Sequence, residues 1–196
     1  MPISQASTRQ LIHTRRVTCH GFRRDDGLWD IEGHIVDVKT YTFNTSCRGD
    51  IAPGDYIHEM FMRVTVTDNF KVVDVEAEIL KSPFAVCGTV AGRFRQLVGL
   101  TIGAGWNRAI KEQLGGVRGC THLVELLGPI ATTAFQTIYP VLAREQAERT
   151  RDRPAGASGE ASGERPALLD VCHVFDTNGA YVREHWPNHY TGATGG

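Results

Sequence analysis

Three stretches of the chain carry side chains that can move protons or hold metal ions. The first is Gly119-Cys120-Thr121-His122, which precedes a long apolar helical pattern. A thiol at a helix start lies beside exposed backbone N–H groups and the positive end of the helix dipole, which lower its pKa. His122 can act there as a base, a metal ligand or an anion contact. The alternative is that Cys120 is a small buried residue at a tight turn and that Thr121 caps the helix.

The second stretch is the predicted strand Asp30-Ile31-Glu32-Gly33-His34. Side chains alternate between the two faces of a strand, so Asp30, Glu32 and His34 share one face. Two carboxylates and an imidazole in a row suit general acid/base catalysis or a carboxylate–histidine metal site. Gly33 belongs to the other face, where it would allow another chain or a ligand to approach closely. The alternative is a polar side of the sheet that faces solvent.

The third group is His58, in a strand where it alternates with apolar residues such as Met60. It is predicted to lie on an apolar face, whereas Glu59 points the other way. A histidine in that setting is either a hydrogen-bonded core residue or a functional group. As a functional group it could meet His34 across two strands and form a two-histidine site with Glu32. That pairing depends on the strand register.

Aromatic residues near these groups could line a pocket for a flat organic ligand. The residues we expect to bind a substrate are Trp29, Tyr41 and Trp106, together with Cys120 at the helix start. The alternative is that the aromatic side chains belong to the hydrophobic core.

The composition is that of an ordinary globular protein. The 196 residues, of which 41% are hydrophobic and 22% charged, fit one domain with an appendage. A net charge of -1 gives no electrostatic reason to expect nucleic-acid binding. The five cysteines are odd in number and widely spaced, which argues against a disulfide framework and a zinc ribbon. There is no Walker, HExxH or GxSxG motif.

The N-terminal segment lacks the apolar region of a signal peptide. No uninterrupted apolar run approaches the ~20 residues that a membrane-spanning helix needs. We therefore expect a cytoplasmic protein that does not contact a membrane.

The patterning predicts an α+β fold. Alternation over residues 28–38, 56–66 and 72–79 predicts an antiparallel sheet of three to four strands, with a hairpin at Asp68-Asn69. After residue 83 the apolar period becomes helical, in three stripes near residues 91–98, 106–114 and 121–142. Gly115-Gly116 is a stop signal for the second helix. We expect the three helices to pack on one face of the sheet.

The flanking segments are expected to be separate from this core. Residues 1–16 read as a flexible arm, residues 17–143 as the α+β domain and residues 144–166 as a flexible linker. Residues 167–190 contain Asn178-Gly179, a strong type I′ turn signal, and are predicted to form a C-terminal hairpin. A lone hairpin is unstable, so it should dock on the domain or on a second subunit, which favours a homodimer.

Several strings resemble an uncharacterised bacterial domain-of-unknown-function family. They are RRDDGLWDIEGHIVD, LVGLTIGAGW, GGVRGCTHLVELLGPIATTAFQ and the tail DVCHVF…VREHWP, with GCTHLVELLGP the most specific. The resemblance implies a fold family and no established activity. The resemblance also implies an association with the catabolism of aromatic compounds.

The order of elements is also similar to iron–sulfur scaffold proteins of the IscU/SufU type. That resemblance implies cysteine ligands, and Cys87 and Cys120 match two of the three positions. Cys47 lies in the connection where the third would be, but lacks the neighbouring pattern of that family. The resemblance therefore implies the fold more than the cluster chemistry.

These observations predict an enzyme for a small molecule. We expect a lyase, in one version aldehyde-releasing, or a hydrolase, acting on an aromatic or phenolic compound by general acid/base chemistry. The expected catalytic groups are Glu32, His34, His58 and His122, with no cofactor or with a divalent metal. The alternatives are an iron–sulfur or metal carrier and a non-catalytic binding module.

Overall fold

The computed structural model describes residues 7–151, 165–166 and 168–192. The chain divides into two compact units, Met1–Arg149 and Thr150–Gly196. The first unit holds the strands and the main hydrophobic cluster, and the described residues of the second unit include three short helices.

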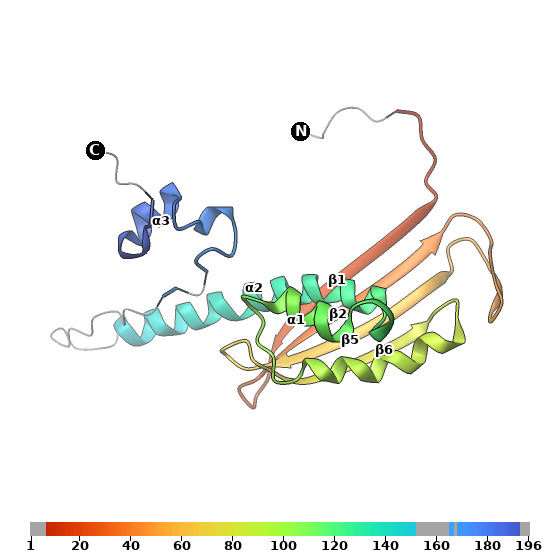
Figure 1. Cartoon of the computed structure of the whole chain (residues 1–196), viewed down its shortest axis with the longest axis horizontal. Helices are drawn as coiled ribbons and strands as arrows, with labels where there is room; N and C mark the ends of the chain where they lie inside the picture. Colours follow the sequence, from red (N-terminus) through yellow and green to blue (C-terminus); the bar gives the residue numbers. More distant parts are fainter. Residues whose placement is uncertain (1–6, 152–164, 167, 193–196) are drawn as a thin grey trace. The chain divides into compact units, whose positions relative to one another are not determined.

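The sheet of the first unit is antiparallel and has four strands in the order β1-β2-β5-β6 (Figure 1). The strands are β1 (His13–Arg23), β2 (Trp29–Lys39), β5 (Tyr56–Val66) and β6 (Val72–Lys81). Between β2 and β5, the short strands β3 (Phe43–Thr45) and β4 (Gly49–Ile51) pair with each other as a separate hairpin. The predicted turn at Asp68-Asn69 connects β5 to β6, so the expected hairpin is confirmed.

Strand β1 begins at His13, inside the segment that the sequence predicts to be a loose arm. It pairs with β2 along its whole length, from His13 opposite Lys39 to Arg23 opposite Trp29. The polar composition of its first residues is explained by its place at the edge of the sheet, where most of its side chains are exposed. Residues 13–16 therefore belong to the domain.

Four helices follow the sheet in the first unit. They are the 3₁₀ helices η1 (Ala85–Leu97) and η2 (Gly116–Arg118) and the α-helices α1 (Trp106–Leu114) and α2 (Thr121–Arg151). Helix α1 ends at Gly115, as the sequence predicts. Buried residues of η1, α1 and α2 join one hydrophobic cluster with the core-facing side chains of the sheet. The α+β class and the packing of the helices on one face are confirmed.

Glycine allows α2 to lie close against the sheet. A Cβ atom added to Gly33 would be 2.9 Å from side-chain atoms of Ile130 and Leu126, both on α2. A Cβ atom at Gly21 of β1 would be 1.9 Å from the Oγ1 atom of Thr137. The close approach predicted at Gly33 is therefore confirmed, and the approaching group is this helix.

Helix α2 is long and apolar enough to cross a membrane by length and composition alone, with a mean hydropathy of 1.2 over 18 residues. Its apolar residues Leu123, Leu126, Leu127, Ile130, Ala134 and Ile138 are buried in the core of the domain. Of that apolar window 28% is buried, so packing on the sheet accounts for part of the apolar composition. The expectation that the protein does not contact a membrane stays a prediction.

The second unit contains short helices where a hairpin is predicted. Residues 173–189 form η3 (His173–Phe175), α3 (Ala180–His185) and η4 (Pro187–His189), so the prediction of two strands is wrong. Gly179 has a φ of -83° and precedes α3 as its N-cap residue, so Asn178-Gly179 does not form the type I′ turn. The rings of Phe175, Tyr181 and Trp186 pack together in this unit.

The linker prediction is partly outside the described residues. Helix α2 continues to Arg151, so residues 144–151 are helical rather than flexible. Residues 152–164, which make up most of the predicted linker, are not described.

Candidate functional site

Strand register places three polar side chains in one row at the end of the sheet. Asp37, near the end of β2, lies directly opposite Arg15 of β1 on one side and His58 of β5 on the other. Side chains in register on the same face of neighbouring strands are close enough to touch. The register shifts just after Asp37, where Val38 pairs with Tyr56 and one residue of β5 bulges out. Bulges often occur beside active sites because they redirect side chains.

The Asp37 carboxylate accepts four hydrogen bonds. Oδ1 is 2.8 Å from Nε2 of His13 and 2.8 Å from Nε of Arg15. Oδ2 is 2.8 Å from Nη2 of Arg15 and 3.0 Å from Nδ1 of His58. Because an ionised carboxylate can only accept, Nδ1 of His58 must carry the hydrogen. In the neutral ring, Nε2 of His58 is then left with a free lone pair.

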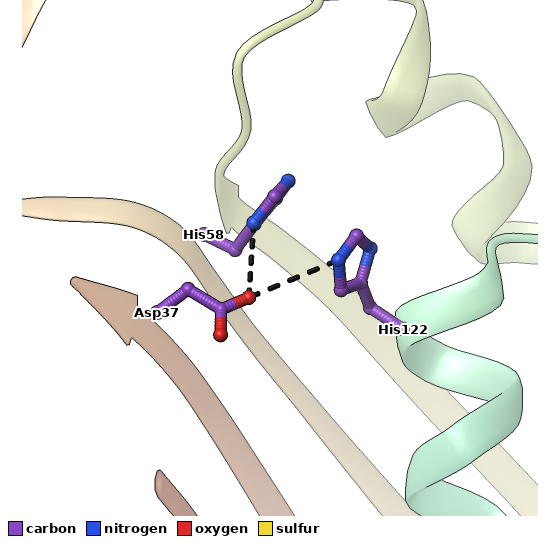
Figure 2. Close-up of side chains that lie close together, drawn as sticks. All are labelled: Asp37, His58 and His122. Atoms are coloured by element: carbon purple, nitrogen blue, oxygen red, sulfur yellow. Dashed lines mark hydrogen bonds and ion pairs between the residues drawn. The ribbon is translucent and has the colours of Figure 1, made fainter. Parts of the chain in front are cut away.

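Helix α2 brings the second imidazole of the site. His122, in its first turn, lies with its ring centroid 4.0 Å from that of His58, and its Nε2 is 3.8 Å from Oδ2 of Asp37 (Figure 2). Its Nδ1 is 3.9 Å from the Sγ atom of Cys120, whose backbone carbonyl accepts the hydrogen bond from Val124 at the start of the helix. Cys120, rather than Thr121, therefore occupies the N-cap position. The predicted helix start is confirmed.

Burial and charge hold Asp37 ionised and both imidazoles neutral. Burial alone would raise the pKa of Asp37, but the guanidinium of Arg15, with His13, lowers it to about 2. The pKa of His58 is lowered by burial and by its neighbour His122. The pKa of His122 is lowered by burial and by Arg15. Near neutral pH the site is therefore an anion between two neutral rings.

The site is closed at the carboxylate and open at the rings. The side chain of Asp37 is 3% exposed, whereas those of His58 and His122 are 17% and 24% exposed. Figure 2 shows the second ring nitrogen of His58 pointing away from the carboxylate. A molecule from solvent can thus reach the imidazoles without reaching Asp37.

The same three side chains could bind a metal ion. In the part of the chain that the structure describes, Asp37, His58 and His122 are the one group of three or more potential metal ligands whose donor atoms lie within 4.8 Å of one another. Cys47, Cys87 and Cys120, the positions suggested by the iron–sulfur resemblance, form no such group. The described residues thus offer imidazole and carboxylate donors rather than a set of thiolates.

Two of the four predicted catalytic residues lie on the opposite face of the sheet. Glu32 accepts a hydrogen bond from Nε of Arg63, and His34 lies 3.6 Å from Glu59. His34 is paired with Phe61, not with His58, so the proposed meeting of His34 and His58 is wrong. The shared face of Glu32 and His34 is as predicted, but it does not face the start of α2. The structure brings together only His58 and His122 of the predicted set.

The residues predicted to bind a substrate are dispersed. Trp29 and Trp106 are 1% and 5% exposed and belong to the hydrophobic core, with Nε1 of Trp29 donating to Asp68. Tyr41 is 44% exposed in the connection after β2. Cys120 lies beside His122 and Met60. Of this group, Cys120 alone contacts the site.

Sequence reasoning missed Asp37, His13 and Arg15. A signal for Asp37 was present, because it continues the period-2 series of Ile31, Gly33 and Ile35 on the buried face. A carboxylate on such a face requires hydrogen-bond or charge partners. His13 and Arg15 were missed because a polar edge strand has the composition of a loose arm.

The comparisons with known proteins give a family. The family described as "Protein of unknown function (DUF2889)" matches residues 13–136, which is more than half of the chain. The match begins at His13 and ends within α2, so it spans the sheet and every residue of the site. The chain belongs to this family. No curated protein and no solved structure matches it.

Proposed function

We propose that this member of the DUF2889 family is an enzyme that acts on a small molecule by general acid/base catalysis, with His58 as the base. The observation that carries the proposal is the pairing of His58 Nδ1 with Oδ2 of Asp37 at 3.0 Å. A buried carboxylate on one ring nitrogen fixes the tautomer and stabilises the imidazolium that forms when the other nitrogen takes a proton.

His122 is proposed as the second proton-transfer group. It lies beside His58, and the two rings cannot both be protonated at low cost because like charges at this distance repel. A proton taken up by one ring therefore favours a neutral neighbour. This arrangement suits a reaction in which one site removes a proton and then returns one.

The reaction class that we propose is a lyase, in its aldehyde-releasing form, with a hydrolase as the alternative. In the lyase reaction Nε2 of His58 accepts the proton of a substrate hydroxyl group. The carbon atom that carries this hydroxyl group becomes the carbonyl carbon of a small aldehyde, and its bond to the neighbouring carbon atom breaks. The electrons of the broken carbon–carbon bond pass into the remaining conjugated fragment, which takes a proton from the site. The reaction needs no external oxidant.

The substrate class that we propose is an aromatic or phenolic compound. This part of the proposal rests on the resemblance to proteins that accompany aromatic catabolism. The openness of the imidazoles to solvent is compatible with it, because a flat ring can approach them from outside while Asp37 stays covered.

The test is turnover of phenolic compounds that carry a hydroxymethyl group, with cleavage of the carbon–carbon bond that attaches this group. The measurement is release of aldehyde, followed with an aldehyde-trapping reagent, together with the change in ultraviolet absorption of the aromatic product. Replacing a general base lowers the rate by about 10²–10⁴-fold. We expect losses of that size for His58→Gln and a smaller loss for His122→Gln.

The matched control is His34→Gln, on the opposite face of the same sheet. It should keep the wild-type rate. Full activity in a folded His58→Gln variant would contradict the proposal, as would an equal loss in His34→Gln.

A further inference from the structure

The geometry points to a divalent transition-metal site of the zinc class formed by Oδ2 of Asp37, Nδ1 of His58 and Nε2 of His122. We propose that one Zn²⁺ ion binds these three donors and keeps a fourth position open to solvent. The inference uses the site of the proposed function but does not depend on the reaction proposed there.

Distances between the donor atoms carry the inference. Oδ2 of Asp37 is 3.0 Å from Nδ1 of His58 and 3.8 Å from Nε2 of His122. In a tetrahedral site with bonds of about 2.0–2.1 Å, neighbouring donor atoms are roughly 3.3 Å apart. These two separations fall on either side of that value, and all three donor atoms lie within 4.8 Å of one another, so no pair has to close by more than about 1.5 Å to complete the coordination.

The charges around the site also favour a cation. Asp37 contributes one negative charge, and the positive charge of Arg15 is shared with Glu125, whose Oε2 lies 2.5 Å from Nη1 of Arg15. Because the imidazoles are neutral, the charges of Asp37, Arg15 and Glu125 sum to one net negative charge beside the donor atoms. A divalent ion therefore meets a site of the opposite sign.

The neighbours of Asp37 resemble the outer shell of a metal site. His13 donates to Oδ1, and Arg15 donates to both oxygens, from Nε to Oδ1 and from Nη2 to Oδ2, so the plane of the carboxylate is fixed with Oδ2 on the side of the two rings. Such outer hydrogen bonds orient ligands, and their loss typically costs about 10–100-fold in metal affinity. Two imidazoles and one carboxylate with an open position match the ligand type of catalytic zinc.

Binding of the ion changes where the protons are. Nδ1 of His58 must give up the hydrogen that it shares with Asp37, so binding releases a proton. A substrate hydroxyl bound at the open position would have a lower pKa. The ion would thus promote the same proton removal that His58 performs as a base in the metal-free protein. The metal therefore changes how the substrate proton is removed but not the proposed class of reaction.

The test is a titration of the full chain with Zn²⁺ in the absence of substrate. The chain carries Cys47→Ser and Cys172→Ser, which remove the two exposed thiols, and is first treated with a chelator. Calorimetry should show one equivalent of binding. Affinity should fall by more than about 100-fold in Asp37→Asn, His58→Gln and His122→Gln, a larger loss than outer-shell changes cause. The control His34→Gln should bind like the parent.

A second measurement does not depend on whether variants of the metal-binding residues fold. X-ray absorption of the zinc-loaded parent should show nitrogen and oxygen neighbours at about 2.0–2.1 Å and no sulfur at about 2.3 Å. Absence of binding, a sulfur neighbour, or an equal loss of affinity in His34→Gln would overturn the metal site.

The two proposals fail in different ways. Zinc binding without any turnover contradicts the proposed function alone. Turnover by a chain that does not bind zinc contradicts the metal site alone.

Discussion

Arg15 and Asp37 form a bidentate ion pair across β1 and β2, with Nε on Oδ1 and Nη2 on Oδ2, both at 2.8 Å. The pair ties the edge strand to the buried end of its neighbour and holds the carboxylate that orients His58. A polar edge strand is thus part of the site and not only of the sheet.

Replacing Arg15 should destabilise the fold, because Asp37 would remain buried without its main counter-charge. Removing one partner of a fully buried pair costs about 3–5 kcal/mol, and the side chain of Arg15 is 33% exposed. We therefore expect Arg15→Gln to lower the free energy of unfolding by about 2 kcal/mol, measured by urea denaturation. Arg16→Gln, one residue along the same strand and exposed, is the control and should stay near wild type.

Acid should destabilise the protein through Asp37. Its pKa is about 2 in the folded chain against an ordinary 3.8, so it stabilises the fold above 3.8 and loses that contribution as the pH falls toward 2. The shift corresponds to about 2 kcal/mol. Urea denaturation at a series of pH values should show the loss in that interval. Asp37→Asn should be less stable at neutral pH and should show a smaller loss on acidification; an unchanged acid profile would contradict the assignment.

The ring of His58 should titrate below its ordinary pKa of 6.5, because burial and His122 both disfavour the charged form. The contribution of the neutral His58 ring to the stability of the fold is therefore present above pH 6.5 and is lost as the pH falls below that value. NMR titration of the ring protons in the metal-free chain measures the midpoint. His122→Gln removes the neighbouring ring that can carry a charge, so it should raise the midpoint. A midpoint at or above 6.5 in the wild type would show that the ring is not buried as described.

Gly33 and Gly128 should respond in opposite directions to a larger side chain. At Gly33 a Cβ atom meets Ile130 and Leu126 at 2.9 Å, so Gly33→Val should cost about 1–3 kcal/mol through overpacking. At Gly128, inside α2, a Cβ atom meets nothing within 4 Å, so Gly128→Ala should stabilise the helix by about 0.5 kcal/mol. Thermal unfolding of the two variants checks both signs. Equal effects would mean that α2 does not lie against β2.

The elements of the fold were largely predictable from local patterns. Alternation in residues 28–38 and 56–66 corresponds to β2 and β5, and the stop at Gly115 ends α1. The C-terminal segment was mispredicted because Asn178-Gly179 is a turn signal that also fits the start of a helix. In the structure Asp176 accepts hydrogen bonds from the backbone N–H groups of Asn178 and Gly179, and Phe175 packs on Trp186.

The sequence by itself determined which face each side chain occupies, because the alternation of a strand is a local property. It placed His58 on an apolar strand face, Glu32 and His34 together on the polar face of their own strand, and Cys120 and His122 at a helix start. It could not determine which residues meet. The tertiary structure decided that through the register of β1, β2 and β5, which sets Arg15, Asp37 and His58 in one row, and through the packing of α2, which brings His122 to it. Register and helix placement depend on contacts between segments far apart in the chain, so no local pattern contains them.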